Sequence, residues 1–145
     1  MEALKKRKKV QVLVTYKDEI LLFKLSPERG GFWQNITGGV DAGEDFLSAA
    51  YRELWEETGL KRNDLAFNLV DLNCDFRFID QYQNDVVEKV FWADLIETNQ
   101  APSVQLSNEH TEFKHFKLHT FDTTLYRFKS NADAFVKMFQ IKQAR

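Results

Sequence analysis

Hydrophobic positions near the start of the chain repeat every second residue, which is the period of a β-strand with a buried face. Val10, Val12 and Val14 follow this period, and a polar turn separates them from a second apolar run at residues 20–25. Residues 10–25 therefore predict a β-hairpin. The breaker-rich segment 26–31 predicts a loop, and the aromatic segment 32–36 predicts a short strand.

The hydrophobic period becomes helical after residue 44. Between residues 44 and 58 the apolar side chains fall three, four and seven positions apart, and Gly59 stands where helices often end. We expect the core-facing stripe of this helix to contain Leu47, Ala50 and Leu54.

The second half of the chain predicts further strands and a closing helix. Residues 65–79 and 86–95 have the composition of two strands that pair with each other, and residues 96–112 predict a polar loop. Ser130 and Asp133 resemble a capping box at the start of the last helix. The amphipathic spacing of that helix is carried by Ala132, Phe135, Val136 and Phe139. This order favours an α/β fold with one sheet packed between helices.

Composition narrows the class of protein. A chain of 145 residues that is 43% hydrophobic has the size and apolar content of a single folded domain spanning residues 1–145. The net charge of -2 provides no overall field to attract a nucleic-acid backbone, and we expect the basic run at residues 5–9 to be solvated. One cysteine, no long apolar stretch and no secretory signal lead us to expect a cytoplasmic protein without a membrane partner.

The acidic residues of the first helix suggest chemistry. Glu53 and Glu57 lie one turn apart on the same helix face with Glu56 beside them, while like charges at this spacing repel and the helix C-terminus disfavours anions. The ordinary interpretation is a solvated acidic face. A bound cation would relieve the repulsion, and carboxylate ligands suit Mg²⁺, which often completes its coordination with substrate phosphates. The glycines before the helix would let the backbone approach such a metal or phosphate closely.

The same segment resembles the Nudix box, G-x(5)-E-x(7)-R-E-U-x-E-E-x-G-U, where U is aliphatic. The box spans 23 residues and is matched at Gly38, Glu44, Arg52, Glu53, Leu54, Glu56, Glu57, Gly59 and Leu60. The resemblance implies a Nudix-type α/β/α sandwich with a mixed β-sheet, and a Mg²⁺-dependent hydrolase, with Mn²⁺ as a possible substitute. Its substrates would be nucleoside diphosphates linked to another group.

The resemblance also assigns roles within the site. It implies metal ligation by Glu53 and Glu57, help from Glu56, and a backbone ligand at Thr37. Arg52 and Glu44 would hold the carboxylates in place. In pyrophosphate cleavage the protein mainly positions charge around the attacking and leaving oxygens.

A general base is also required, and two residues qualify. Glu53 is one candidate. Glu109 is the other, because residues 109–116 resemble the EHxxYKWL-type segment of several Nudix subfamilies in which this glutamate faces the metals. We expect Glu109 to act as a metal ligand or as the base.

Residues 32–38, FWQNITG, resemble a stretch of dihydroneopterin triphosphate pyrophosphatases, whereas the proline of a related pattern in dinucleoside polyphosphate and RNA hydrolases is absent. Trp33 could stack on a pterin or purine or could pack in the core. Candidate phosphate contacts, which could equally be exposed surface residues, are Lys24, Arg29, Lys8 and Lys9. The remaining candidate substrate-binding residues are Gln34, Thr37, Gly38 and Gly39.

Three functions follow from these patterns. The first is hydrolysis of a nucleoside or pterin triphosphate at the α–β bond, releasing a monophosphate and pyrophosphate. The second is hydrolysis of diadenosine tetraphosphate or of a capped or triphosphate RNA 5′ end, the one case in which a nucleic acid is an expected partner. The third is nucleotide sensing without catalysis, although all four box glutamates are present.

Overall fold

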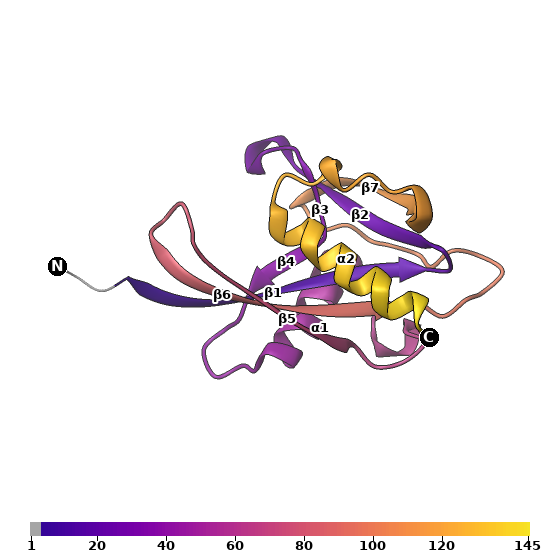
Figure 1. Cartoon of the computed structure of the whole chain (residues 1–145), viewed down its shortest axis with the longest axis horizontal. Helices are drawn as coiled ribbons and strands as arrows, with labels where there is room; N and C mark the ends of the chain where they lie inside the picture. Colours follow the sequence, from indigo (N-terminus) through magenta and orange to yellow (C-terminus); the bar gives the residue numbers. More distant parts are fainter. Residues whose placement is uncertain (1–3) are drawn as a thin grey trace.

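The computed structural model describes residues 4–145 and contains a mixed sheet between two helices (Figure 1). The helices are α1 (Phe46–Thr58) and α2 (Lys129–Gln143). The strands are β1 (Lys5–Tyr16), β2 (Glu19–Leu25), β3 (Trp33–Gln34), β4 (Ile36–Gly39), β5 (Val70–Ile79), β6 (Asn84–Asp94) and β7 (His110–Lys117). The expected α/β fold, an α/β/α sandwich with a mixed sheet, is confirmed.

The long strand β1 organises the sheet. It pairs antiparallel with β2 and β4 and parallel with β6, giving the path β3-β2-β1-β6-β5, with β7 on β2. The expected pairing of the fifth and sixth strands is present. The sheet brings β4, which leads into α1, next to residues 9–12 in the middle of β1.

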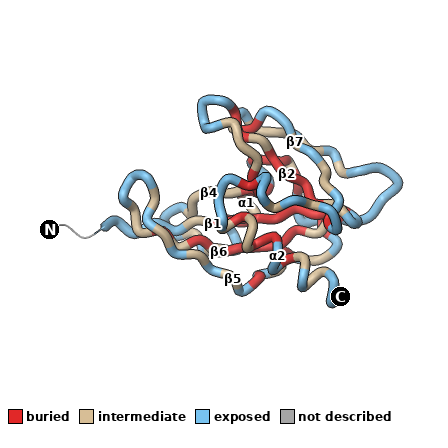
Figure 2. Tube along the Cα trace, turned by 45° about the horizontal axis from the view of Figure 1, so that its top comes forward, coloured by how far each residue is buried: buried red, intermediate tan, exposed pale blue. Residues whose placement is uncertain are grey.

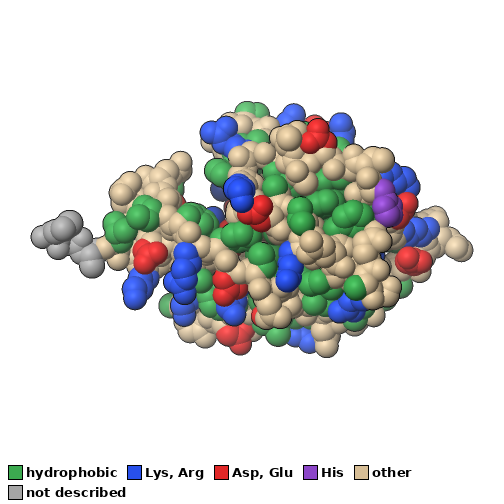
Figure 3. Space-filling view, in the orientation of Figure 1, with side chains coloured by type: hydrophobic (Ala, Val, Ile, Leu, Met, Phe, Trp, Pro, Cys, Tyr) green, Lys and Arg blue, Asp and Glu red, His purple; other side chains and the backbone are tan. Residues whose placement is uncertain are grey.

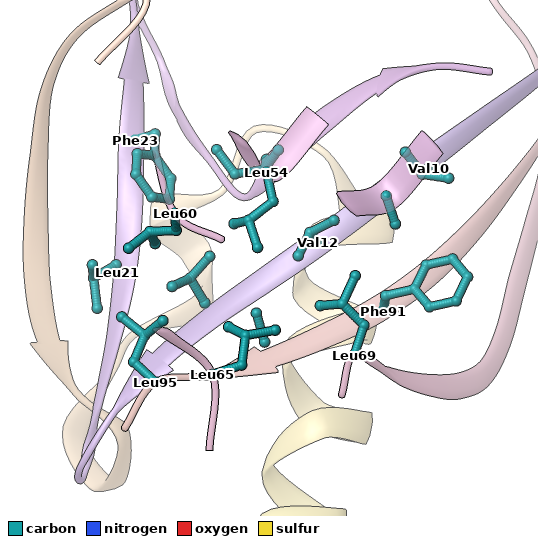
Figure 4. Close-up of a cluster of buried hydrophobic side chains, with 14 of the residues drawn as sticks. Val10, Val12, Leu21, Phe23, Leu54, Leu60, Leu65, Leu69, Phe91 and Leu95 are labelled. Carbon is teal, nitrogen blue, oxygen red and sulfur yellow. The ribbon is translucent and has the colours of Figure 1, made fainter. Parts of the chain in front are cut away.

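Each face of the sheet has its own core. Val10, Val12 and Leu54 belong to the cluster between the sheet and α1 (Figure 4), whereas Leu13, Trp92 and Met138 belong to the cluster under α2. These faces are called the α1 face and the α2 face below. Figure 2 shows the buried residues concentrated along the middle of β1, β2 and β6.

Several strand boundaries differ from expectation, including the start of β1, which is Lys5 rather than residue 10. The strand predicted from residue 65 begins only at Val70, because residues 62–64 form a 3₁₀ turn and Leu65 reaches the core from a loop with one isolated bridge to Leu95. The predicted loop 96–112 ends early, because β7 starts at His110. Its pairing partner β2 lies about ninety residues earlier in the chain, so no local pattern signals it.

Three details predicted for the helices also differ in the structure. Helix α1 begins at Phe46 with Asp45 as its N-cap, and Leu47 is 42% exposed rather than in the core stripe. Its side chain leans toward the N-terminus from the first turn, which carries it beyond the core. The predicted capping box of α2 is wrong: the N-cap is Phe128 without a side-chain hydrogen bond, while Asp133 pairs with Lys129 at 2.8 Å.

The apolar stripe of α2 is partly as expected. Phe135 is buried, and Ala132 and Phe139 pack against the α2-face core, but Val136 is 48% exposed. Asn131, Ala134 and Met138 complete the buried face instead. Among the described residues, no helix is long and apolar enough to span a bilayer.

Candidate active site

Arg52 on α1 connects the loop after β4 to the acidic face of the helix. Its Nε and Nη2 donate to the two carboxylate oxygens of Glu44, each at 2.8 Å, in a bidentate pair. Nη2 also donates to the carbonyl of Gly39 at 2.7 Å. The pairing lowers the pKa of Glu44 to about 2, so this carboxylate stays ionised at neutral pH.

The remaining guanidinium nitrogen of Arg52 faces the box glutamates. Nη1 donates to Glu53 Oε1 at 2.9 Å and lies 3.3 Å from Glu56 Oε2. Arg52 thereby holds Glu44, Glu53 and Glu56 around one guanidinium.

Glu53 is buried, with 8% of its surface exposed, against the backbone of β4. Gly38 makes this possible, because a Cβ at Gly38 would collide with the Glu53 carboxyl group. Burial raises the pKa of Glu53 to about 7, and the Arg52 contact only partly offsets it. At neutral pH, Arg52 therefore only partly compensates the negative charge of the buried Glu53 carboxylate.

Glu57 and Glu109 form a second acidic pair on the same side of α1. Ser107 Oγ donates to Glu57 Oε2 at 2.7 Å, and His110 Nδ1 lies 2.8 Å from the same oxygen. Burial opposes ionisation of Glu57, but these contacts hold its pKa below the usual value. Burial and then the Glu57 charge raise the pKa of Glu109, whose carboxylate lies 3.4 Å from Arg29.

His110 closes the inner end of this pair. Only 2% of its side chain is exposed, its ring packs at a centroid distance of 5.8 Å from Phe23, and neither ring nitrogen has a partner in hydrogen-bond geometry. The short contact with Glu57 is therefore close in distance but poorly aligned. A buried donor this close to the carboxylate restricts where the Glu57 side chain can lie.

The carboxylates suit a hard divalent cation in their chemistry. Four of them, Glu53, Glu56, Glu57 and Glu109, border one edge of α1, and the absence of a side chain at Gly38 leaves room for the buried Glu53. Within residues 4–145, however, no three acidic, histidine or cysteine side chains are arranged as a ready-made metal group. The donor types fit Mg²⁺, and their arrangement is set by Arg52, Ser107 and His110.

The candidate substrate contacts divide between the two faces. Thr37, Gly38 and Gly39 lie in β4 beside the carboxylates, and Gln34 Nε2 donates to Thr37 Oγ1 at 3.3 Å. Trp33 packs edge-on against Phe116 on the α2 face, and Lys24 pairs in register with Trp33 on that face. Lys8 lies on the α1 face with its Nζ 5.6 Å from the Phe46 ring centroid.

The sequence analysis did not assign roles to several residues that shape the site. Ser107 and His110 contact Glu57, and Asp41 lies 3.5 Å from Arg52. The proximity of Ser107 and His110 to Glu109 in the sequence was the available signal.

Comparison with known proteins fits this arrangement. The model of the NUDIX domain matches residues 5–139. The chain belongs to the NUDIX domain family. Nudix hydrolases generally use divalent metals.

Solved structures in the family share the fold. The Nudix chain is 24% identical to an Ap4A hydrolase of C. elegans, with a TM-score of 0.75 over 96% of this chain and 99% of that one. It is 23% identical to the dihydroneopterin triphosphate pyrophosphohydrolase of E. coli, with a TM-score of 0.73 over 92% of this chain and 95% of that one.

Among curated sequences, an RNA pyrophosphohydrolase of Pelagibacter ubique is 47% identical over 60 residues, which is 41% of this chain and 38% of that protein. The chain spans less than two thirds of the length of the curated relatives it matches.

Proposed function

We propose that this Nudix protein is a Mg²⁺-dependent pyrophosphohydrolase, for which Mn²⁺ can substitute, acting on the triphosphate group of a nucleoside or pterin triphosphate. Water attacks a phosphorus atom, the α–β phosphoanhydride bond breaks, and a monophosphate and pyrophosphate leave. The observation that carries the proposal is the buried Glu53 carboxylate on Gly38, joined through Arg52 to Glu44 and Glu56. The single cysteine and this substrate class suit a cytoplasmic protein.

The proposed roles follow from the contacts. Glu53, Glu56, Glu57, Glu109 and the Thr37 carbonyl would hold Mg²⁺, which supplies positive charge to the phosphate oxygens. Arg52 and Glu44 orient the carboxylates. Glu53 or Glu109 takes the proton of the attacking water, since both have a pKa raised toward neutrality, as a general base requires.

The β4 residues that border the carboxylates are the proposed phosphate contacts. Thr37, Gly38 and Gly39 present backbone groups there, and Gln34 orients the Thr37 side chain. We also propose Lys8, Lys24 and Trp33 as contacts to more distant parts of the substrate, with Trp33 stacking on the base.

A second substrate is favoured by one specific observation. The aligned Pelagibacter ubique protein is an RNA pyrophosphohydrolase, so a triphosphate at an RNA 5′ end is the second candidate for the same chemistry. Diadenosine tetraphosphate is the third, because the C. elegans neighbour is an Ap4A hydrolase.

The test measures pyrophosphate and phosphate release from nucleoside triphosphates, dihydroneopterin triphosphate, diadenosine tetraphosphate and 5′-triphosphate RNA, with Mg²⁺ and with EDTA. We expect Mg²⁺-dependent release that EDTA abolishes. Glu53→Gln and Glu57→Gln should each lower kcat by several orders of magnitude, while the exposed Glu97→Gln should not change it. Binding without turnover of any substrate would favour a nucleotide sensor.

A further inference from the structure

One end of the sheet projects from the body of the protein toward the N-terminus (Figure 1). This wing consists of residues 5–9 of β1, 76–79 of β5 and 84–88 of β6. Figure 3 shows a notch between the wing and the body at the top of the view. In the basic run expected to be solvated, residues 5–8 are exposed and Lys9 is half-buried, and the backbone of the run is a paired strand rather than a free terminus.

The strand register sorts the basic residues of the wing onto two faces. Lys9 pairs with Glu88 and Arg7 with Val86, and both partners share the α2 face with Val90 of its core. Lys5, two residues before Arg7, follows on the same face. The wing thus presents three cations in a row, about 6.6 Å apart along the strand.

Aromatic side chains form a second row on that face. Phe76 pairs with Glu88 and Phe78 with Val86, so the cross-strand rows read Lys9, Glu88, Phe76 and Arg7, Val86, Phe78. Both phenylalanines are half-buried, which leaves part of each ring exposed. A positive row beside aromatic rings is the arrangement that binds the backbone and bases of single-stranded nucleic acid.

The cations of this row are available to a ligand. Within residues 4–145, none of the five basic residues at 5–9 forms an ion pair with an acidic side chain. Glu88 is buried and accepts from Gln11 at 2.9 Å, and Asp80 accepts from the backbone of Tyr82 and Asn84. The net charge of -2 therefore hides a local concentration of positive charge.

The row ends beside the edge strand β4, which carries the box glycines. Arg7 Nη2 lies 3.6 Å from the Cβ position of Gly39, whose carbonyl accepts from Arg52, and the backbone of Val40 donates to the Lys8 carbonyl at 3.0 Å. The box carboxylates lie on the α1 face, so a chain bound along the α2 face of the wing would bring its 5′ end to them around the edge of β4.

We infer that the α2 face of the wing binds the nucleotides that follow the 5′ end of an RNA strand while the terminal phosphates lie at the box. The inference rests on the proposed function and specifies RNA, among the candidate substrates, as the one that binds. Lys5, Arg7 and Lys9 bind successive phosphates, and Phe76 and Phe78 stack on bases. Lysines on an edge strand can instead serve to prevent strand pairing between molecules, which predicts changes in solubility and none in RNA affinity.

The test compares two matched pairs of substitutions. Arg7→Gln/Lys9→Gln removes one arginine and one lysine from the α2 face, and Lys6→Gln/Arg77→Gln removes the same two residue types from the α1 face of the same wing. Fluorescence anisotropy with a 5′-monophosphate RNA ten-mer in EDTA measures binding without turnover. In a plot of log affinity against log salt concentration, the slope of the first variant should be smaller in magnitude than that of wild type by about 1.4, because two phosphate contacts are lost.

We expect the α1-face pair to bind RNA within twofold of wild type and the α2-face pair to bind at least tenfold more weakly at low salt. Phe78→Leu should weaken binding at least about fivefold through lost stacking. Equal affinities for the two paired variants would overturn the inference. So would binding of phosphatidylserine vesicles, but not RNA, that depends on Arg7 and Lys9.

Turnover separates this inference from the proposed function. In wild type, KM for 5′-triphosphate RNA should fall as the oligonucleotide lengthens, and the α2-face variant should lose this dependence. Hydrolysis of triphosphates without wing-dependent RNA binding would overturn the wing inference alone. Wing-dependent RNA binding without hydrolysis of any substrate would overturn the proposed function alone.

Discussion

Gly38 and the carboxyl group of Glu53 meet so closely that no side chain fits between them. A Cβ at Gly38 would overlap the Glu53 carboxyl group. The glycine of the box is therefore required by packing against a glutamate fifteen residues later in the sequence. Its backbone φ lies outside the left-handed region, so steric space rather than conformational freedom explains it.

Gly38→Ala should lower kcat/KM at least 100-fold, because the Glu53 carboxylate must leave its place and a small displacement of a catalytic group is costly. Gly39→Ala is the control for the steric argument, since its Cβ would meet only Arg7 Nη2 at 3.6 Å. Thermal unfolding should show a lower Tm for Gly38→Ala than for Gly39→Ala. Equal Tm values would contradict the packing explanation.

Arg52→Lys should reduce activity and Mg²⁺ affinity by about 10- to 100-fold, which is typical of losing a residue that orients metal ligands. A lysine cannot reproduce the planar fork that contacts Glu44, Glu53 and the Gly39 carbonyl together. Mg²⁺ titration of kcat measures the effect. Arg62→Lys is a matched control, because Arg62 lies on the Tyr51 ring away from the box carboxylates, and it should leave the Mg²⁺ dependence unchanged.

The sequence predicted those parts of the molecule whose contacts are local. Helix α1 carries Glu53, Glu56 and Glu57 at spacings of three and four residues, and Glu44 precedes its partner Arg52 by eight residues. The sequence of the box therefore predicts most of the acidic cluster. Strand β7 was missed because its partner is β2, and the contacts of Ser107 with Glu57 join residues fifty apart. Such pairings depend on how the sheet assembles.

The distribution of charge on the wing also could not be predicted from the sequence. Composition gives only a net charge of -2, whereas the parallel pairing of β1 with β6 decides that Arg7 and Lys9 share a face with Phe76 and Phe78. A one-residue shift in that register would move these cations to the other face. The position of the basic row is thus a property of the assembled sheet.

The substitution Glu88→Gln should increase stability relative to wild type more at pH 8 than at pH 4. Burial raises the pKa of Glu88 above its usual value of 4.5, so the folded state disfavours the charged form. Wild-type stability is therefore lost as pH rises from the unfolded pKa through the folded pKa, and each tenfold difference in proton affinity between the two states corresponds to about 1.4 kcal/mol. Glutamine at this position still accepts from Gln11 and does not titrate.

The measurement is Tm against pH for wild type and Glu88→Gln, with Glu97→Gln as the control. The difference in Tm between Glu88→Gln and wild type should increase between pH 4 and pH 8. A difference that stays constant across this range would show that folding does not shift the pKa of Glu88, and a difference that decreases would show that the folded state stabilises its charged form.

Leu54→Ala should cost about 2–5 kcal/mol of unfolding free energy, whereas Leu47→Ala should change it by no more than about 0.5 kcal/mol. Leu54 is fully buried against the α1-face core, and Leu47 points in nearly the same direction from α1 but is 42% exposed at its first turn. Urea unfolding in EDTA measures both without a contribution from metal binding. Similar costs for the two substitutions would mean that the first turn of α1 also packs on the sheet, which would bring Glu44 and its pairing with Arg52 closer to the core.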